Sequence, residues 1–299
     1  MDFDALGTCL TTPACVVTQT TSGLIVGMLL FLVAAGVTLI FGVLKIVNFA
    51  HGTFYMLGGY VAYTALGVTE SYTVAVLAGA LAMALCGVLF ERGLMSRVYG
   101  SNVLMQLLVC YAVVLIFDDV VKIVWGPEFH AMGMPAAFQV PPLFIAGGVV
   151  PPFYAALIGV AAVIAIVLGL GLGLTRLGKT VRAAALNPQM VSALGVNTTA
   201  LFAIVFAVGG GLAGLAGALA APVRSLSPGM GFSILIESFI VTVIGGMGSI
   251  AGALVAALLI GMVRAFGTIG FPSFTDGLIY ILMIVILLLR PQGLFGRKA

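Results

Sequence analysis

The polar residues whose spacing could support chemistry gather in one stretch, KIVNFAHGTFYMLGGY at residues 45–60. Asn48 and His51 are three positions apart, and His51 and Tyr55 are four apart, so a helix would place them near one face. Within a membrane, such side chains face a bundle interior or a water-filled path. Two interpretations stay open. Either Asn48 caps the helix and His51 binds a neighbouring helix, or these residues and Thr53 line a solute path.

These polar residues do not amount to a metal or catalytic site. A metal ion needs several ligands, and the second histidine of the chain, His130, falls in a distant loop. A membrane-embedded enzyme would need a clustered nucleophile and base, and the sequence offers His51 no carboxylate cluster. We therefore predict no catalytic residue, no bound metal and no enzymatic activity for this chain.

The overall composition is that of a membrane protein. Of the 299 residues, 62% are hydrophobic and 7% are charged, whereas a soluble domain has about 25% charged residues. The mean hydropathy is +1.29, and several apolar runs reach about 20 residues, the length of a membrane-spanning helix. The runs are apolar on all sides, which excludes an outer-membrane barrel. The basic residues are scattered, which argues against nucleic-acid binding.

Roughly nine apolar segments follow one another along the chain. The predicted fold is therefore an all-α polytopic membrane protein, a bundle of about 8–10 transmembrane helices in a single domain over residues 1–299. The seventh segment is short for a full span, which favours a broken or tilted helix surrounded by protein. The segments are expected at about 20–43, 49–67, 72–90, 102–121, 151–174, 199–221, 232–246, 250–268 and 277–290.

The distribution of lysine and arginine predicts the orientation of the bundle. With the N-terminus outside and nine spans, nine basic residues fall inside and three outside, as the positive-inside rule requires. Residues 1–19 and 122–150 are then outer segments, 175–199 is an inner loop, and the C-terminus is inside. The inner residues are Lys45, Arg92, Arg97, Arg176, Lys179, Arg182, Arg290, Arg297 and Lys298, and the outer ones are Lys122, Arg224 and Arg264.

The cysteines fit this orientation. Cys9 and Cys15 lie six positions apart in the outer N-terminal segment, where an oxidising compartment would permit a disulfide. Two free thiols are the alternative, and the sequence does not decide between them. Cys86 and Cys110 fall within apolar segments and are expected to be small packing residues.

The inner loop, residues 175–199, predicts two short helices separated by a turn at Asn187. Gly195 is expected to cap the second helix, and Asn197 to start the next one. Residues 173–180, GLTRLGKT, match the pattern of a phosphate-binding loop. Such a loop needs a preceding strand, and here a membrane-length apolar helix precedes it. We therefore predict that this chain binds no nucleotide.

Five motifs then occur in a characteristic order: NFAHGTFYMLGGY, LGKTVRAAALNPQMVSALGVN, GGGLAGLAGALAAP, VIGGMGSIAGALVAALLIG and the closing RPQGLFGR. Together they resemble permeases of the high-affinity branched-chain amino acid ABC transporter family, the Liv-type membrane subunit. The resemblance covers about residues 20–297. Each motif alone is weak, and the specificity lies in five motifs in order.

This resemblance implies an ABC importer permease fold in a bacterial inner membrane, forming half of a path for branched-chain or related small amino acids. It implies a second related permease, two cytoplasmic ATPase subunits and an outer solute-binding protein as partners. ATP and magnesium would be bound by the ATPases, so no cofactor is expected on this chain. The coupling segment that meets an ATPase would lie at 178–197, and its contact residues would be Arg182, Ala184, Asn187, Ala193 and Gly195.

Two positions depart from the pattern that many relatives share. Thr53 stands where many carry an acidic residue, and Glu237 stands where many carry a basic one. Other solutes, such as amides, urea or aromatic acids, therefore remain open. Glu237 would either pair with an outer arginine such as Arg224 or contact the solute or the second permease. Gln106 is expected to join helices first and to line the path second.

The mechanism also has an alternative. An ion-coupled secondary transporter should show paired intramembrane carboxylates or broken helices in a repeated arrangement, and the sequence shows isolated acids.

The glycine-rich late segments predict close helix packing, including the pairs Gly210-x-x-x-Gly214 and Gly248-x-x-x-Gly252. The glycines expected at such contacts are Gly210, Gly214, Gly217, Gly245, Gly246, Gly248 and Gly252.

Overall fold

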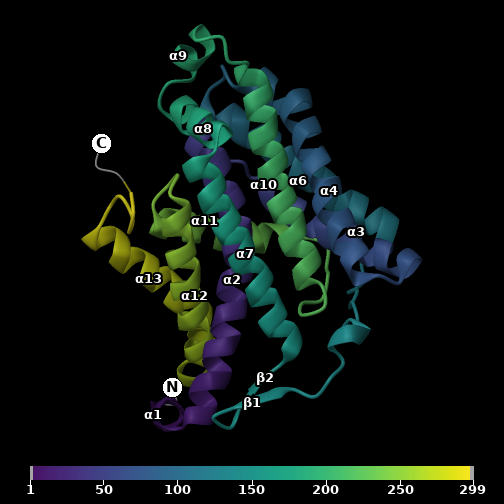
Figure 1. Cartoon of the computed structure of the whole chain (residues 1–299), viewed down its shortest axis with the longest axis vertical. Coiled ribbons are helices and arrows are strands. Elements are labelled where there is room, and N and C mark those ends of the chain that lie inside the picture. The colour runs from purple at the N-terminus through teal and green to yellow at the C-terminus, as the bar shows by residue number, and fades with distance from the viewer. Residues whose placement is uncertain (1–2, 297–299) are drawn as a thin grey trace.

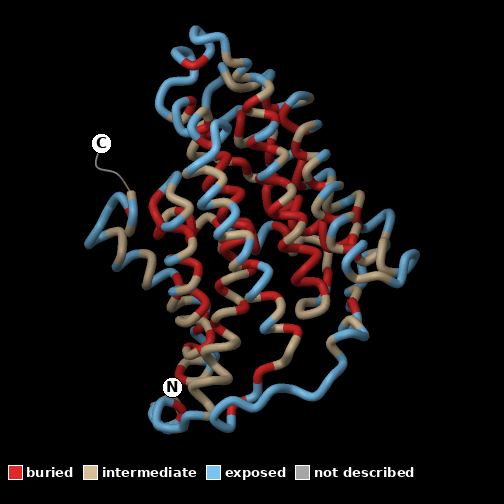
Figure 2. The backbone as a smooth tube through the Cα atoms, viewed as in Figure 1, coloured by how far each residue is buried: buried red, intermediate tan, exposed pale blue. Residues whose placement is uncertain are grey.

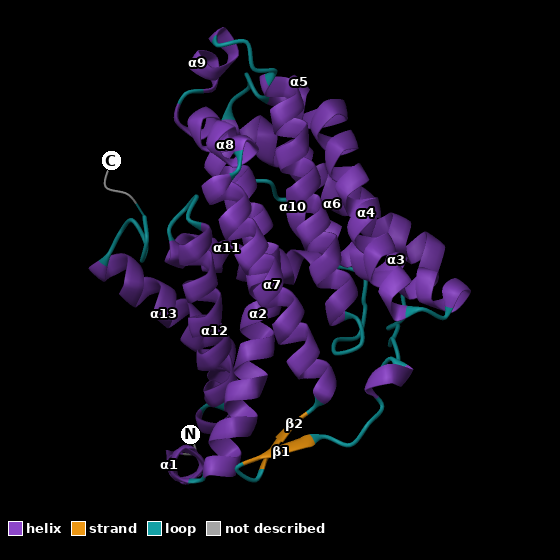
Figure 3. Cartoon of the chain, viewed as in Figure 1, coloured by secondary structure: helices purple, strands orange, loops and turns teal. Residues whose placement is uncertain are grey.

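The computed structural model describes residues 3–296, and this part of the chain is almost entirely helical (Figure 3). Arg297 and Lys298, two of the predicted inner residues, lie outside the described residues. The helices are α1 (Phe3–Thr11), α2 (Pro13–Leu44), α3 (His51–Thr69), α4 (Tyr72–Phe90), α5 (Ser96–Val98), α6 (Val103–Trp125), α7 (Pro152–Leu174), α8 (Arg176–Leu186), α9 (Pro188–Ala193), α10 (Thr198–Ala220), α11 (Met230–Gly245), α12 (Ile250–Gly270) and α13 (Thr275–Leu289).

Each of the nine predicted segments forms a helix, which confirms the all-α class. In the described part, six helices are long and apolar enough to cross a membrane. α11 has 16 residues, which agrees with the short seventh segment. α2 begins at Pro13, seven residues earlier than predicted, because proline is well suited to the first turn of a helix. The six are Pro13–Leu44, Tyr72–Val98, Pro152–Leu174, Thr198–Ala220, Ile250–Gly270 and Pro272–Leu289. The second combines α4 and α5 with the π-helical turn between them, and the last adds the short 3-10 helix before α13.

The core is built around α2, which packs against α12, α10, α11 and α7 (Figure 1). Every residue from Leu29 to Ile40 on this helix is buried. Figure 2 shows buried backbone concentrated along the inner helices and exposed backbone along the outside of the bundle. The spans formed by α7 and α13 are largely exposed, as expected for apolar helices that face lipid.

Two helices begin inside the bundle rather than at its ends. After α2 ends at Leu44, residues 45–50 return along it, and the His51 imidazole Nε2 lies 3.1 Å from the Val33 carbonyl oxygen. α11 starts beside this point, because Gly231 contacts the backbone of Gly52. Backbone that is neither helix nor strand therefore enters the interior here, where protein rather than lipid surrounds it.

Glycines permit the close crossing of α3, α4 and α10. Gly58 of α3 meets the backbone of Gly214, and Gly217 meets the carbonyl group of Tyr55. A side-chain carbon at Gly210 would lie 2.6 Å from a backbone oxygen of α4. These contacts support the predicted role of small residues at helix–helix interfaces.

The second predicted glycine pair is wrong. Gly248 lies in the turn between α11 and α12 with φ +89°, so Gly248 and Gly252 do not share a helix. Gly246 ends α11 with φ +98°, a conformation that favours glycine. Gly252 instead packs against Gly245, which brings the end of α11 onto the start of α12.

The end of the bundle opposite α8 and α9 carries α1 and a hairpin of β1 (Leu143–Ile145) and β2 (Gly148–Val150) (Figure 1). The hairpin was not predicted. It packs on the first turns of α2, where the Val149 amide donates a hydrogen bond to Thr18 Oγ1 at 3.1 Å. The structure joins Cys9 and Cys15 in a disulfide, with their Cα atoms 5.2 Å apart.

We expect thiol counting to detect this disulfide. Denatured protein without reductant should take up two maleimide groups, on Cys86 and Cys110, because the chain has four cysteines and the other two are bonded. Added reductant should raise the count to four, measured by mass spectrometry. Four labels without reductant, on protein isolated with thiols blocked at lysis, would contradict the bond.

Candidate functional site

A small cavity lies where α2, α3 and α11 meet. About 30 Å³ of its space is open to the centre of a water molecule, which is room for about two waters. An amino acid does not fit in this space. The cavity is lined by Ile25, Val26, Leu29, Leu30 and Val33 of α2, Tyr55 of α3, Val223 and Arg224 of the segment after α10, and Ile234 of α11.

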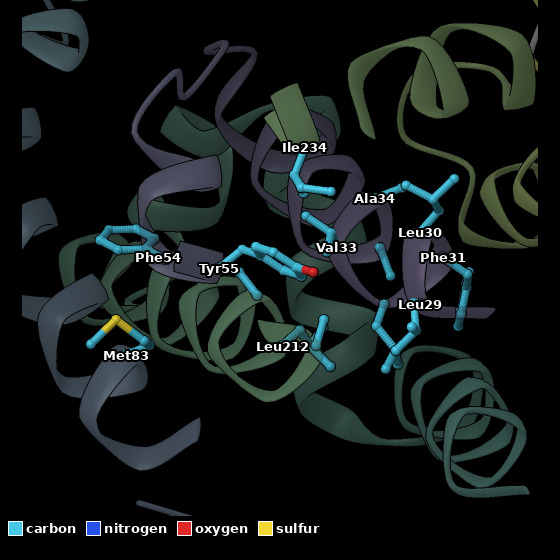
Figure 4. Close-up of a cluster of buried hydrophobic side chains, with 14 of the residues drawn as sticks. Leu29, Leu30, Phe31, Val33, Ala34, Phe54, Tyr55, Met83, Leu212 and Ile234 are labelled. Atoms are coloured by element: carbon cyan, nitrogen blue, oxygen red, sulfur yellow. The ribbon is translucent and has the colours of Figure 1, made fainter. Parts of the chain in front are cut away.

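Tyr55 is the predicted path residue that lines this cavity. It stands one turn into α3, and its side chain is directed at α2 because the neighbouring Phe54 packs on the opposite side. Figure 4 shows the Tyr55 hydroxyl close to Val33 and pointing away from Phe54. The charged groups that act on this hydroxyl are Arg224 and Glu237. The cavity is thus apolar on the α2 side and polar at Tyr55.

The other residues of the polar stretch make local contacts. Asn48 does not cap α3, which begins one residue after Ala50. Its Oδ1 accepts a hydrogen bond from the Ala50 amide at 3.0 Å. His51 is fully buried between α2 and α10, where its ring touches Gly36. Neither residue lines the cavity, nor does the buried Thr53. The hydrogen bonds of Asn48 and His51 therefore hold the start of α3 in place.

Gln106 is also turned away from the cavity. Its amide nitrogen lies 3.2 Å from the carbonyl oxygens of both Val98 and Ser101. These oxygens end the helical segment before α6, and one buried side chain satisfies both of them. Gln106 thus fastens the turn between α5 and α6.

Glu237 forms an ion pair with one of the predicted outer arginines, which was the first of its two open interpretations. Arg264 of α12 lies 2.9 Å from Glu237 and, through its other nitrogen, 2.9 Å from Asp276 at the start of α13. Arg224 was the example given of such an arginine. It does not form the pair because α12 runs beside α11 and brings Arg264 closer. Glu237 and Arg264 are 17% and 21% exposed, so the pair is largely withdrawn from its surroundings.

We expect Glu237→Gln to lower the free energy of unfolding by about 2 kcal/mol, because Arg264 then keeps only Asp276, its more exposed partner. This value lies between those typical of exposed and of buried ion pairs. The thermal unfolding midpoint of the purified protein measures this effect. The exchanged pair, Glu237→Arg with Arg264→Glu, made and compared in an Asp276→Asn background so that two carboxylates do not meet, should recover part of the loss. Asp119→Asn, which breaks the exposed Lys122–Asp119 pair, should change little. An exchanged pair no more stable than Glu237→Arg alone would contradict the interpretation.

The inner loop has the predicted form of two short helices. Thr175 caps α8, Asn187 caps α9 through the Met190 amide at 3.0 Å, and Asn197 caps α10. Gly195 follows α9 with φ +86°, as predicted. Residues 173–180 join two helices through one extended residue, with no strand before them, so they do not form a phosphate-binding loop.

Four of the five predicted coupling residues are exposed, and one is not. Arg182, Asn187, Ala193 and Gly195 lie on the surface. Ala184 is fully buried, because α8 packs this side against α7 and α2. The prediction that Ala184 contacts a partner is therefore wrong in this arrangement, and the residue instead holds α8 on the bundle.

A row of exposed apolar side chains on the same loop was missed. Leu186, Met190 and Leu194 follow at intervals of four residues and are 81%, 62% and 77% exposed. We call these three residues the loop ridge. The spacing itself was the available signal. Beside the ridge lies an open groove of about 350 Å³, lined by Pro188, Gln189, Ser192, Thr198 and Phe202.

No group of histidine, cysteine, aspartate or glutamate residues within 3–296 could hold a metal ion. The polar features of this part of the chain include the cavity beside Arg224, the ion pairs of Arg264 with Glu237 and Asp276, and the polar loop that carries the exposed apolar residues.

Comparisons with known proteins agree with this description. Residues 19–287 match the family model described as the permease component of branched-chain amino acid transport systems. The chain is 30% identical to the high-affinity branched-chain amino acid transport system permease protein BraD of Pseudomonas aeruginosa, over 93% of this chain and 95% of the relative. It is equally similar to LivH of Escherichia coli K12, with the same coverage. A probable LivH of Methanocaldococcus jannaschii is 28% identical. No solved structure matches the chain.

Proposed function

Because this chain belongs to the family of permease components of branched-chain amino acid transport systems, we propose that it forms half of the path through which an ABC importer moves branched-chain or related small amino acids. It is a multi-pass membrane protein and a transport subunit, not an enzyme. The observation that carries the proposal is the small, mainly apolar cavity between α2, α3 and α11, lined largely by α2.

The proposed assembly has four kinds of partner: a second related permease, two cytoplasmic ATPases, an outer solute-binding protein and the surrounding lipid. The loop ridge supports the contact with an ATPase, because large apolar side chains at a membrane protein's polar end are otherwise unexplained. The neighbouring groove gives a partner side chain a place to insert. In this proposal α8 and α9 transmit the ATPase movement to α2 and α7, on which α8 packs.

We further propose that the protein lies in the plasma membrane of a bacterium, with its N-terminus outside and its C-terminus inside. The basic residues support this orientation, because Arg176, Lys179 and Arg182 lie at the α8 end (Figure 1). The disulfide at the opposite end supports it too, because disulfides persist in oxidising compartments.

Uptake by vesicles that contain the reconstituted complex tests the proposal. The panel comprises leucine, isoleucine, valine, polar amino acids, urea, amides and aromatic acids, each with and without ATP. ATP-dependent uptake of leucine or valine is the expected result. ATP-dependent uptake of urea or an amide instead would support an importer but would reject branched-chain amino acids as its solutes. Uptake driven by an ion gradient without ATP would reject the importer in favour of a secondary transporter.

A further inference from the structure

Arg224 lines the small cavity between α2, α3 and α11, and no carboxylate of the described residues pairs with it. The residues within 3–296 form three ion pairs, and Arg224 takes part in none of them. It lies in the segment between α10 and α11, is only partly exposed, and lines the cavity with Tyr55. A partly buried arginine is costly unless an anion or a polar partner balances its charge. The site therefore has a positive charge that the chain itself leaves available.

The nearby carboxylate does not fill this role. Glu237 acts on the same tyrosine hydroxyl as Arg224, but Arg264 holds its carboxylate at 2.9 Å. The remaining lining of the cavity, apart from Tyr55 and Arg224, consists of aliphatic side chains from α2, α11 and Val223. The cavity lining thus combines a neighbouring guanidinium and hydroxyl with branched aliphatic surface.

We propose that Arg224 and the Tyr55 hydroxyl bind the carboxylate of the transported amino acid, while its aliphatic side chain packs on Ile25, Leu29 and Val33 of α2. The inference rests on the proposed function and adds the residues that recognise the solute. A guanidinium binds a carboxylate through two parallel hydrogen bonds, and the tyrosine supplies a third donor. The aliphatic wall gains from burying a branched side chain.

This arrangement also separates the candidate solutes by charge. Urea and simple amides carry no negative charge, so they would leave Arg224 without a partner. An amino acid or an aromatic acid would satisfy it. The small size of the cavity shows that α2 and α11 must move apart before any of them can enter.

Equilibrium binding of radiolabelled leucine to the detergent-solubilised complex, without the solute-binding protein, tests the inference. Arg224→Gln should weaken binding at least about tenfold, because a charge-assisted pair is lost. Arg224→Lys should retain part of the affinity. Tyr55→Phe, which removes one oxygen, should weaken binding about threefold to tenfold. The matched control Arg92→Gln removes an exposed arginine away from the cavity and should bind leucine as the unmodified complex does.

Competitors give an independent readout on the unmodified complex. Isoleucine and valine should displace labelled leucine, whereas 3-methylbutylamine, which is leucine without its carboxylate, should not. Displacement by this amine at the concentrations where valine acts would overturn the proposal, as would unchanged leucine affinity in Arg224→Gln. If that variant does not assemble, by size-exclusion elution, unchanged affinity in Tyr55→Phe and Arg224→Lys together overturns it. Failure of the unmodified complex to take up any amino acid with ATP would instead reject the proposed function.

Discussion

Replacing both Leu186 and Leu194 by serine is expected to weaken ATPase binding strongly while the permease itself stays folded. The two side chains are 81% and 77% exposed, so their loss removes little packing within the chain. Burial of each leucine by a partner contributes about 1.5–3 kcal/mol. Together the two substitutions should weaken the association by at least about a hundredfold. Co-purification of the ATPases with the tagged permease, followed by titration, measures the change.

Leu104→Ser serves as the matched control, because Leu104 is 64% exposed on α6 and lies outside the loop ridge. It should leave ATPase binding intact. Met190→Leu keeps an apolar side chain on the ridge and should also bind normally. Unchanged ATPase affinity in the double serine variant would show that the ridge is not the contact. Failure of the double serine variant to fold would contradict the expectation that Leu186 and Leu194 contribute little packing within the permease.

Gly217→Val is expected to prevent the permease from folding. A side-chain carbon at this position would overlap the backbone carbonyl oxygen of Tyr55 and lie 3.1 Å from the Gly59 amide nitrogen. Backbone atoms of two packed helices cannot move aside as a flexible side chain can. Overpacking a core typically costs about 1–3 kcal/mol, and separating two helix backbones should exceed that range. The amount of monodisperse protein on size-exclusion chromatography measures the outcome.

Gly159→Val is the control for this substitution, because a carbon at Gly159 on α7 has no neighbour within 4 Å. Both changes put the same β-branched residue into a membrane helix, so a difference between them isolates the crossing of α3 and α10. Gly217→Ala should give an intermediate result, with folded protein of lower thermal stability. Normal yield of Gly217→Val would show that the two helices are not in such close contact.

The sequence was a good guide to features that depend on neighbours along the chain. Apolar runs located nine of the thirteen α-helices in residues 3–296. Asn197 and Gly195 identified the ends of the helices around the inner loop, because caps are local. The early start of α2 was missed since Thr18 and its polar neighbours interrupt the apolar pattern, although proline at position 13 marks a helix start.

Contacts between distant segments were not predictable in this way. Nothing near Glu237 indicates that Arg264, on the next helix, approaches it more closely than Arg224 does. The family resemblance placed Ala184 at the contact with an ATPase. In the structure this small residue is buried, which lets α8 lie close to the bundle. The polar stretch at 45–60 was recognised, but the structure separates its members. Tyr55 reaches the cavity, and His51 binds the backbone of α2.

The length of α2 has a mechanical consequence. Its 32 residues make a rod about 48 Å long, which exceeds the roughly 30 Å of hydrocarbon in a bilayer. α8 and the β2 strand both pack on this rod, and it supplies five of the nine residues that line the cavity. A tilt of about 5° displaces one end of such a rod by about 4 Å relative to the other. We therefore expect α2 to act as a lever, so that a small displacement at the inner loop would shift both the cavity wall and the outer hairpin.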